Sequence, residues 1–357
     1  MVTSRVYYEK VDQADSSEVI QQRFRRLLDA SGILVQVKPR DQVVMKLHFG
    51  EAGNTGFIKP EWVRVISQKI KERQAVPVMA ETNTLYRGQR TNSKDHLALA
   101  ARHGFTLEKA GAGIIIPEDS PDNVMDVSVE QPYIKVAKVI KLFLEADVLV
   151  SLAHFKGHLM TGFGGALKNI GMGCASREGK LAQHGGVAPF VDEGRCVGCG
   201  ECAVVCPADA IALEQKRAFI DGELCIGCAS CIAACPQEAI DVPWEAGGET
   251  IQEKMVEYAK AVLDARQGKT VFVNFAVKIT KECDCLAKDD PRICPDIGLF
   301  ASLDPVSVDK ACYDQVMAAS GRDVLREAHP HCDGMKQLLY AQRLGLGRMD
   351  YTLILVE

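Results

Sequence analysis

The 357-residue chain lacks any long hydrophobic run. Its most apolar stretches, such as Val148 to Ala153, have the length of a strand, and a membrane span needs about 18 or more apolar residues. The first thirteen residues contain neither an apolar segment nor a small-residue cleavage site, so we expect no signal peptide. These absences predict a cytoplasmic protein with no membrane span.

An excess of basic charge is also missing. The chain has 42 Lys and Arg against 47 Asp and Glu, a net charge of −5, which excludes the basic surface of a dedicated nucleic-acid binder. Neither a P-loop nor a G-x-G-x-x-G fingerprint occurs, so no flavin or nicotinamide donor is indicated. The hydrophobic fraction of 47% excludes a disordered chain, and the length favours two or three domain-sized units.

Strand-like and helix-like segments alternate along most of the chain. This rhythm predicts an α/β fold with a mostly parallel open sheet and helices on both faces. The predicted strands are 43–48, 76–80, 113–116, 147–153, 270–275 and 352–356. The predicted helices are 60–73, 93–103, 134–144, 249–266, 306–319 and 335–344.

Residues 190–244 interrupt this rhythm and carry eight of the 14 cysteines. We therefore expect one discontinuous α/β domain, formed by residues 1–189 and 245–357, with 190–244 as an insert. Three domains in series are the alternative, but 113 residues after the insert are few for a complete open sheet. With Glu245 included, the segment has ten acidic and three basic residues, so the acidity of the protein is local to it.

The cysteines of this segment form a repeat. Each half reads C-x2-C-x2-C-x3-C-P, which is the bacterial pattern for two [4Fe-4S] clusters in an α+β ferredoxin module, with the fourth ligand crossing to the other cluster. One predicted ligand set is Cys196, Cys199, Cys202 and Cys235; the other is Cys225, Cys228, Cys231 and Cys206. Zinc sites or reduced thiols are the alternative, but four-cysteine zinc sites usually pair two C-x2-C hooks.

Imidazoles and thiols flank the module on both sides. We expect a pocket beside it that holds a third metal or a catalytic site, because such a donor mixture suits transition metals. Its candidate residues are His154, His158, Cys174, His184, Cys283 and Cys285. The alternative for each histidine is an ordinary core or surface role. For Cys294, Cys312 and Cys332 we prefer buried, reduced thiols.

Polar side chains gather where the predicted strands end. Ligands of open parallel sheets bind at the carboxyl ends of the strands, so these residues predict a site for an anionic substrate. The candidates are His48, Asn83, Lys156, Lys168 and Asn169, with Asn274 at a further strand. A glycine-rich turn at 162–165 precedes a predicted helix, which also suits an anion.

Four phrases of the sequence resemble the family known as domain of unknown function 362, in its form with a ferredoxin insert. They are KLHFGEAGNTGFIKPEWV, HFKGHLMTGFGGALKNIGMG, the step Cys283-Asp284-Cys285, and DIGLFASLDPVSVDKA. The resemblance spans nearly the full length and implies iron-sulfur binding and an α/β pocket, without naming a substrate. A fainter likeness, to the nickel-pincer lactate racemases, rests on the α/β layout and a histidine pair, and its chemistry is not transferred.

The favoured hypothesis is an iron-sulfur oxidoreductase, in which a redox partner protein supplies electrons and the pocket receives them. There Lys156, Lys168 or a histidine would orient the substrate or supply a proton. One alternative is a non-catalytic electron carrier whose large domain docks a partner. Another is a metal-dependent enzyme in which the clusters are structural or sense redox state.

Overall fold

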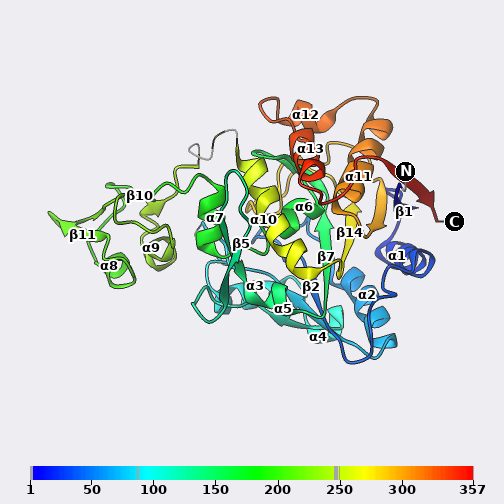
Figure 1. Ribbon diagram of the computed structural model, residues 1–357, viewed down its shortest axis with the longest axis horizontal. Coiled ribbons are helices and arrows are strands. Elements are labelled where there is room, and N and C mark those ends of the chain that lie inside the picture. The colour runs from blue at the N-terminus through cyan, green and yellow to red at the C-terminus, as the bar shows by residue number, and fades with distance from the viewer. Residues whose placement is uncertain (1–2, 87, 245–247, 249, 357) are drawn as a thin grey trace.

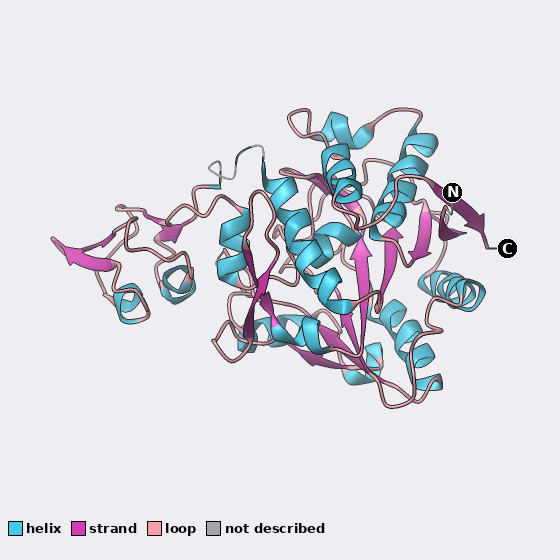
Figure 2. Cartoon of the chain, viewed as in Figure 1, coloured by secondary structure: helices cyan, strands magenta, loops and turns pink. Residues whose placement is uncertain are grey.

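The computed structural model describes residues 3–86, 88–244, 248 and 250–356. Within them, eight strands form one sheet in the order β16-β1-β15-β14-β7-β2-β3-β4 (Figure 2). These strands are β1 (Ser4–Lys10), β2 (Gln42–Lys46), β3 (Val76–Ala80), β4 (Gly113–Ile115), β7 (Val148–His154), β14 (Thr270–Ala276), β15 (Gly298–Ser302) and β16 (Tyr351–Leu355). Only β15 runs antiparallel to its neighbours. The predicted fold class, α/β with a mostly parallel sheet, is confirmed.

Helices cover both faces of this sheet, and each side has its own hydrophobic core (Figure 1). One core contains side chains of α1 (Ser17–Ser31), α2 (Pro60–Glu72), α3 (Ser93–Arg102) and α4 (Leu107–Ala110). The other contains side chains of α5 (Lys141–Glu145), α6 (Ala166–Gly171), α10 (Ile251–Arg266), α11 (Pro305–Ser320), α12 (Val324–Ala328) and α13 (Met335–Arg343). None of the helices in the described ranges combines the length and hydropathy needed to cross a membrane.

Burial from both sides explains the local sequence of the central strands. Every residue of β7 is buried, which accounts for its nearly continuous apolar run. Pro60 opens α2, where a proline costs no helical hydrogen bond. Asp304 caps α11, since its Oδ1 accepts from the amides of Val306 and Ser307 at 2.9 Å each.

The predicted helix at 134–144 is wrong. Residues Val136–Ile140 form strand β6, which pairs antiparallel with β5 (Val124–Ser128), and only α5 after it is helical. The β-branched residues of β6 favour a strand, and Lys138 reaches across the hairpin to Asp126 at 3.0 Å.

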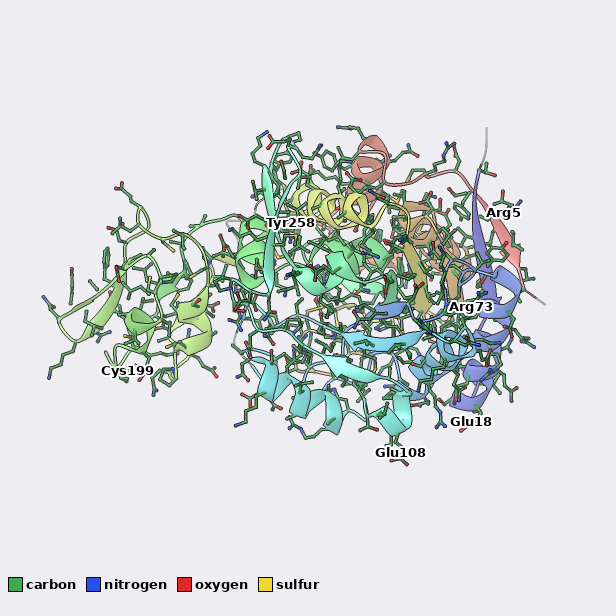
Figure 3. The ribbon with its side chains drawn as sticks, turned by 60° about the horizontal axis from the view of Figure 1, so that its bottom comes forward. Arg5, Glu18, Arg73, Glu108, Cys199 and Tyr258 are labelled. Atoms are coloured by element: carbon green, nitrogen blue, oxygen red, sulfur yellow. A yellow bond between two sulfur atoms is a disulfide. The ribbon has the colours of Figure 1, made fainter. Side chains whose placement is uncertain are left out.

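Residues 190–244 form a lobe at one end of the molecule, and both chain termini lie at the other (Figure 1). The lobe has its own hydrophobic cluster, and Cys199 is exposed in it (Figure 3). Its elements are α8 (Glu201–Val204), α9 (Ser230–Ala234), β10 (Phe190–Val191), β11 (Ile211–Glu214), β12 (Arg217–Ile220) and β13 (Ile240–Asp241). The predicted boundary at residue 245 and the predicted helix start at 249 lie outside the described residues.

Helix α6 packs so closely on α10 that glycine is required between them. A Cβ on Gly171 would lie 2.1 Å from the carbonyl oxygen of Met255. We expect Gly171→Ala to lower the free energy of unfolding by about 1–3 kcal/mol, because the two helices must move apart. Denaturant titration of the purified protein measures this. Gly113→Ala, at a position with no atom within 4 Å of the added Cβ, is the control and should change stability little.

Candidate functional site

A cavity of about 720 Å³ opens at the carboxyl ends of β2, β3 and β7. Lys46 at the end of β2, Glu81 after β3 and His154 at the end of β7 all line it. This is where ligands bind in open α/β sheets. The remaining wall includes the short strand β8 (Lys156–His158), helices α6 and α7 (Arg177–Gln183), and the loop that follows β14.

Asp284 fixes the loop after β14 over the strand ends. Its buried carboxylate lies 2.9 Å from His154 Nδ1 and 3.0 Å from Lys156 Nζ. Burial alone would raise the pKa of Asp284, but the cations of His154 and Lys156 hold it well below its usual range. The Asp284 backbone carbonyl also accepts from the amide of Glu51 at 3.0 Å. The residues on either side, Cys283 and Cys285, line the cavity.

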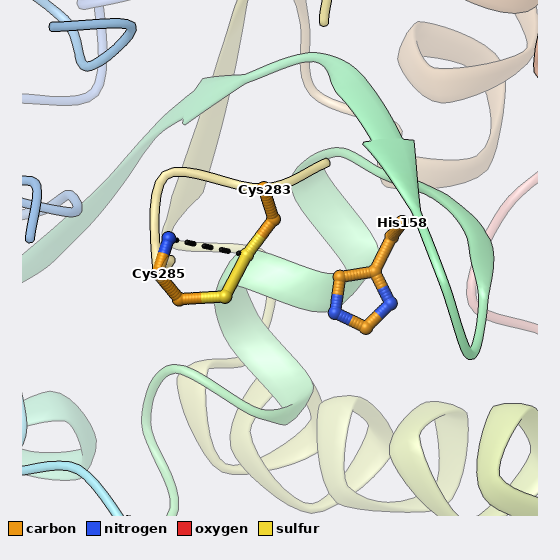
Figure 4. A group of neighbouring side chains, drawn as sticks. All are labelled: His158, Cys283 and Cys285. Atoms are coloured by element: carbon orange, nitrogen blue, oxygen red, sulfur yellow. Dashed lines mark hydrogen bonds between the residues drawn. A yellow bond between two sulfur atoms is a disulfide. The ribbon is translucent and has the colours of Figure 1, made fainter. Parts of the chain in front are cut away.

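His158 lies beside these two cysteines, which form a disulfide with each other (Figure 4). One nitrogen of His158 and the two sulfurs all lie within 4.8 Å of one another. The approach depends on Gly157, whose amide donates to Thr280 O at 2.9 Å and whose missing Cβ would lie 2.2 Å from Lys281 O. The structure therefore brings together three of the six residues predicted for a metal or catalytic site.

The other three predicted members have different surroundings. His154 lines the cavity, but its Nδ1 contacts Asp284 and its Nε2 lies 2.9 Å from Val277 O. Because both partners only accept hydrogen bonds, both nitrogens donate and neither is left to bind a metal. Cys174 lies in the hydrophobic core and is not among the residues that line the cavity, and burial raises the pKa of its thiol to about 12.

His184, the remaining member, lines the cavity and stacks edge-on against Trp244 with 5.0 Å between ring centroids. Burial, and then the nearby charge of Lys168, lower the pKa of His184 to about 4. Its Nδ1 is buried without a hydrogen-bond partner in the described structure. His184 is therefore a neutral imidazole with a buried, unpaired Nδ1.

Most cations around the cavity are paired with a carboxylate. Lys46 Nζ lies 2.7 Å from Glu81, and Arg90 Nε lies 2.9 Å from Glu51. Within the described residues, Lys168 and Lys180 have no such ion pair. Lys180 Nζ donates only to neutral acceptors, Thr82 Oγ1 and Asn83 O, both at 2.6 Å.

Burial changes the chemistry of these two lysines. It lowers the pKa of Lys168 to about 7, with a further contribution from the charge of Lys156, and it lowers the pKa of Lys180 to about 8. Both amines therefore exchange protons near neutral pH. A bound anion would favour their charged forms, so this end of the cavity suits a negatively charged ligand.

The glycine-rich turn at 162–165 does not offer an anion site. The amides of Ala166 and Leu167, at the start of α6, donate to the buried carboxylate of Asp309 at 2.7 and 3.0 Å. Asn274, predicted at a strand end, lies within β14 and donates to the same carboxylate. Both features serve to anchor α6, and through it Lys168, to the sheet.

Of the other residues predicted to bind a substrate, His48 and Asn169 line the cavity and Asn83 does not. His48 lines the cavity, but its Nε2 lies 2.8 Å from Arg90, and burial followed by that charge lowers its pKa well below the usual range. Asn169 also lines the cavity, with its amide donating to Ser151 at 2.8 Å. Asn83 is buried outside the cavity lining, where its side chain bonds to Ser93.

The eight cysteines of the lobe gather in two groups. Cys196, Cys199, Cys202 and Cys235 line one small cavity, and Cys206, Cys225, Cys228 and Cys231 line another. Backbone amides donate to three of the sulfurs at 3.3–3.4 Å. Two of these bonds, from Ala210 to Cys206 and from Ala239 to Cys235, occupy equivalent positions of the repeat. Whether these thiols bind clusters stays a prediction.

The lobe and the large cavity share a wall. Leu85 lines the cavity and packs in the hydrophobic cluster of the lobe, together with Leu181 of α7. A Cβ on Gly227, in a cysteine loop of the lobe, would lie 3.5 Å from Leu181 Cδ2. Only one layer of side chains therefore separates this cysteine loop from α7, which also carries Lys180.

Sequence reasoning missed several residues of this site. Asp284 was visible only as the residue between two cysteines, with no signal of its ion pairs. Lys46 stands in an otherwise apolar strand and Glu81 directly follows one, so strand-end polarity could have found both. Lys180 lies on a short helix of mixed composition and gave no signal.

The family model described as domain of unknown function (DUF362) matches residues 43–314, more than half of the chain. The chain belongs to this family. The matched segment of this DUF362 member includes the cavity wall from Lys46 to Cys285. The match does not by itself identify the inserted module. No curated protein matches the chain.

Two solved structures are similar in fold to this DUF362 protein. The lactate racemase apoprotein of Thermoanaerobacterium thermosaccharolyticum is 14% identical with a TM-score of 0.39, over 77% of this chain and 51% of that one. A Thermotoga maritima protein is 11% identical with a TM-score of 0.42, over 86% and 59%. The chain thus spans little more than half of each. Similarity at this level carries no argument about function.

Lys168 allows a test of the buried charge. Its pKa is about 7 in the folded protein and about 10.4 in an unfolded chain. Burying the charged amine therefore lowers the free energy of unfolding by its full amount below pH 7. This effect declines as the pH rises toward 10.4. Lys168→Met should stabilise the protein more at pH 6 than at pH 9, by on the order of 1 kcal/mol after allowance for partial exposure. Denaturant titration at both pH values measures this.

The exposed Lys38→Met variant is the control for this comparison, and its effect should not depend on pH. An equal effect of Lys168→Met at both pH values would show that the amine is not buried in its charged form.

Proposed function

We propose that this protein is an iron-sulfur oxidoreductase that passes electrons from the lobe to an anionic substrate in the large cavity. The observation that carries the proposal is the wall shared by the two parts, formed by Leu85 and α7. In this proposal residues 190–244 are a ferredoxin module inserted into a discontinuous α/β domain of residues 1–189 and 245–357. A redox partner protein supplies the electrons.

The donor set of the lobe fits two [4Fe-4S] clusters. Each small cavity presents four thiols from one C-x2-C-x2-C triple and the trailing cysteine of the other half. Amide hydrogen bonds to sulfur favour the thiolate form of such ligands. Gly198 has φ +68°, and a Cβ there would lie 2.1 Å from Lys216 O, so the loop around Cys199 can close only with glycine. Bound clusters of this type supply one-electron transfer.

The cavity supplies the binding and proton chemistry. Lys168 and Lys180 have pKa values near neutrality because they are buried without a counter-ion, so they can bind an anion and give it a proton. His184, a neutral imidazole, lines the same cavity. Reduction of a bound substrate would thus combine electrons from the lobe with protons from these side chains.

The acidic charge of the lobe supports docking of a basic partner through electrostatic steering. This feature alone would also suit the alternative of a simple electron carrier. A carrier has no need of buried, unpaired lysines around a cavity, whereas an enzyme that binds an anion does. The cavity therefore favours the oxidoreductase.

In each predicted ligand set the fourth cysteine comes from the other half of the repeat, and mutations can test this crossed assignment. Cys235→Ala should perturb the same cluster as Cys199→Ala, although Cys235 belongs to the second repeat, because both line one cavity. Cys206→Ala should match Cys228→Ala. Iron analysis and electron paramagnetic resonance of the anaerobically purified variants measure this. If Cys235→Ala instead gives the spectrum of Cys228→Ala, the crossed assignment is wrong, and iron-free wild type would contradict the proposal itself.

The anion site can be tested with oxalate and inorganic phosphate as probes. At pH 8 Lys168 is largely neutral and Lys180 about half so, and a bound anion raises both pKa values, so binding should take up about one proton. Calorimetry in two buffers with different ionisation enthalpies measures the uptake. The Lys168→Met/Lys180→Met double variant should lose binding, while Lys38→Met should keep it. If neither anion binds, the cavity is not an anion site, and the result favours the alternative of a non-catalytic electron carrier.

A further inference from the structure

His158, Cys283 and Cys285 form a group that the proposed function does not use. Their ligand atoms lie within 4.8 Å of one another on the cavity wall (Figure 4). They come from distant parts of the chain, and two independent contacts hold them together. Gly157 brings β8 against the backbone at Thr280 and Lys281, and the Asp284 ion pairs hold the loop of the two cysteines.

His158 Nε2 is the nitrogen on the side of the two sulfurs (Figure 4). The amide of Met160 donates to His158 Nδ1 at 3.2 Å, so in this neutral ring Nε2 carries the proton. A cation binds Nε2 in the other tautomer, in which that proton has moved to Nδ1 and the Met160 hydrogen bond is given up. Figure 4 shows the ring beside the two sulfurs, with one nitrogen toward them. Neutral imidazole and thiolates are the donors that thiophilic divalent cations prefer.

The disulfide determines whether this donor set exists. In the oxidised pair each sulfur is bonded to the other and neither is a thiolate. Two electrons and two protons convert the disulfide into two thiols, and binding of a divalent cation then releases both thiol protons. The clusters of the proposed function would deliver the two electrons one at a time, and a chemical reductant can replace them.

We infer that Cys283, Cys285 and His158 form a redox-gated site for a thiophilic divalent cation of the zinc type. The reduced site holds the cation through two sulfurs and one nitrogen, and the disulfide releases it. Three protein ligands leave a fourth coordination position, which faces the cavity because all three residues line it. An open position of this kind is typical of catalytic zinc.

The neighbouring groups do not compete for this role. His154 has both nitrogens hydrogen-bonded, and Asp284 is held in its ion pairs with His154 and Lys156. Cys294 is buried in the hydrophobic core and does not line the cavity. Among the described residues, these three form the group of candidate ligands whose donor atoms lie within 4.8 Å of one another. Cys294 provides a matched control thiol.

The test uses the full chain, purified anaerobically with its iron. One sample is reduced with a phosphine and desalted, the other is left unreduced, and alkylation with mass spectrometry reports whether the 283–285 disulfide is open. Both are equilibrated with Zn²⁺ and desalted again, and zinc and iron are counted in the same sample. We expect about one zinc per chain in the reduced protein and almost none in the disulfide form.

Cys283→Ser, Cys285→Ser and His158→Gln should each lose the zinc and keep the iron, whereas Cys294→Ser should keep both. The inference is overturned if open-dithiol wild type binds no zinc, if the disulfide form or the cysteine variants bind as much, or if reduction fails to open the disulfide. The inference relies on the proposed function only for the source of electrons. Loss of electron transfer with the iron intact would count against that proposal and leave the zinc result unaffected. In iron-free protein the thiols of the lobe would also bind zinc, so the site is then measured as the difference in zinc between wild type and Cys283→Ser.

Discussion

The architecture of the site depends on the buried ion pairs of Asp284 with His154 and Lys156. One carboxylate joins the end of β7 to the loop after β14, two segments separated by 130 residues. An unpaired carboxylate at this depth would be strongly unfavourable, so the two ion pairs hold the loop where His154 and Lys156 both reach the carboxylate. That position turns the flanking cysteines into the cavity and closes its wall.

The cationic side chains of the site fall into two groups, those with a carboxylate partner and those without one. Lys46, Arg90 and Lys156 are each matched by a carboxylate and serve to fix the geometry of the walls. Lys180 is buried and Lys168 half-buried, but neither has an acidic partner among the described residues, and the loss of solvation lowers the pKa of both. Buried groups of this kind are expected where binding or proton transfer takes place. Within one cavity, the paired cations thus hold the walls in place, and the unpaired lysines are the groups suited to binding or proton transfer.

Much of the fold could be predicted from local patterns. The apolar run of β7, the proline that opens α2 and the cap of α11 each act over a few residues, so the sequence near them is sufficient. The helix predicted at 134–144 failed because β6 is stabilised by its partner β5 and by the Lys138–Asp126 pair, which a local pattern does not contain. The antiparallel strand β15 went unnoticed for a similar reason, since its pairing with β1 joins residues almost 300 positions apart.

The sequence by itself determined the grouping of the eight module cysteines as a candidate cluster site, because short, repeated spacings restrict where each thiol can point. Most of the side chains that it proposed for the site also line the cavity, since polar residues at strand ends must meet at one edge of a parallel sheet. Only the tertiary structure separated His158, Cys283 and Cys285 from His154 and Cys174. Those roles depend on long-range contacts, the Asp284 ion pairs and the approach at Gly157, which no local spacing encodes.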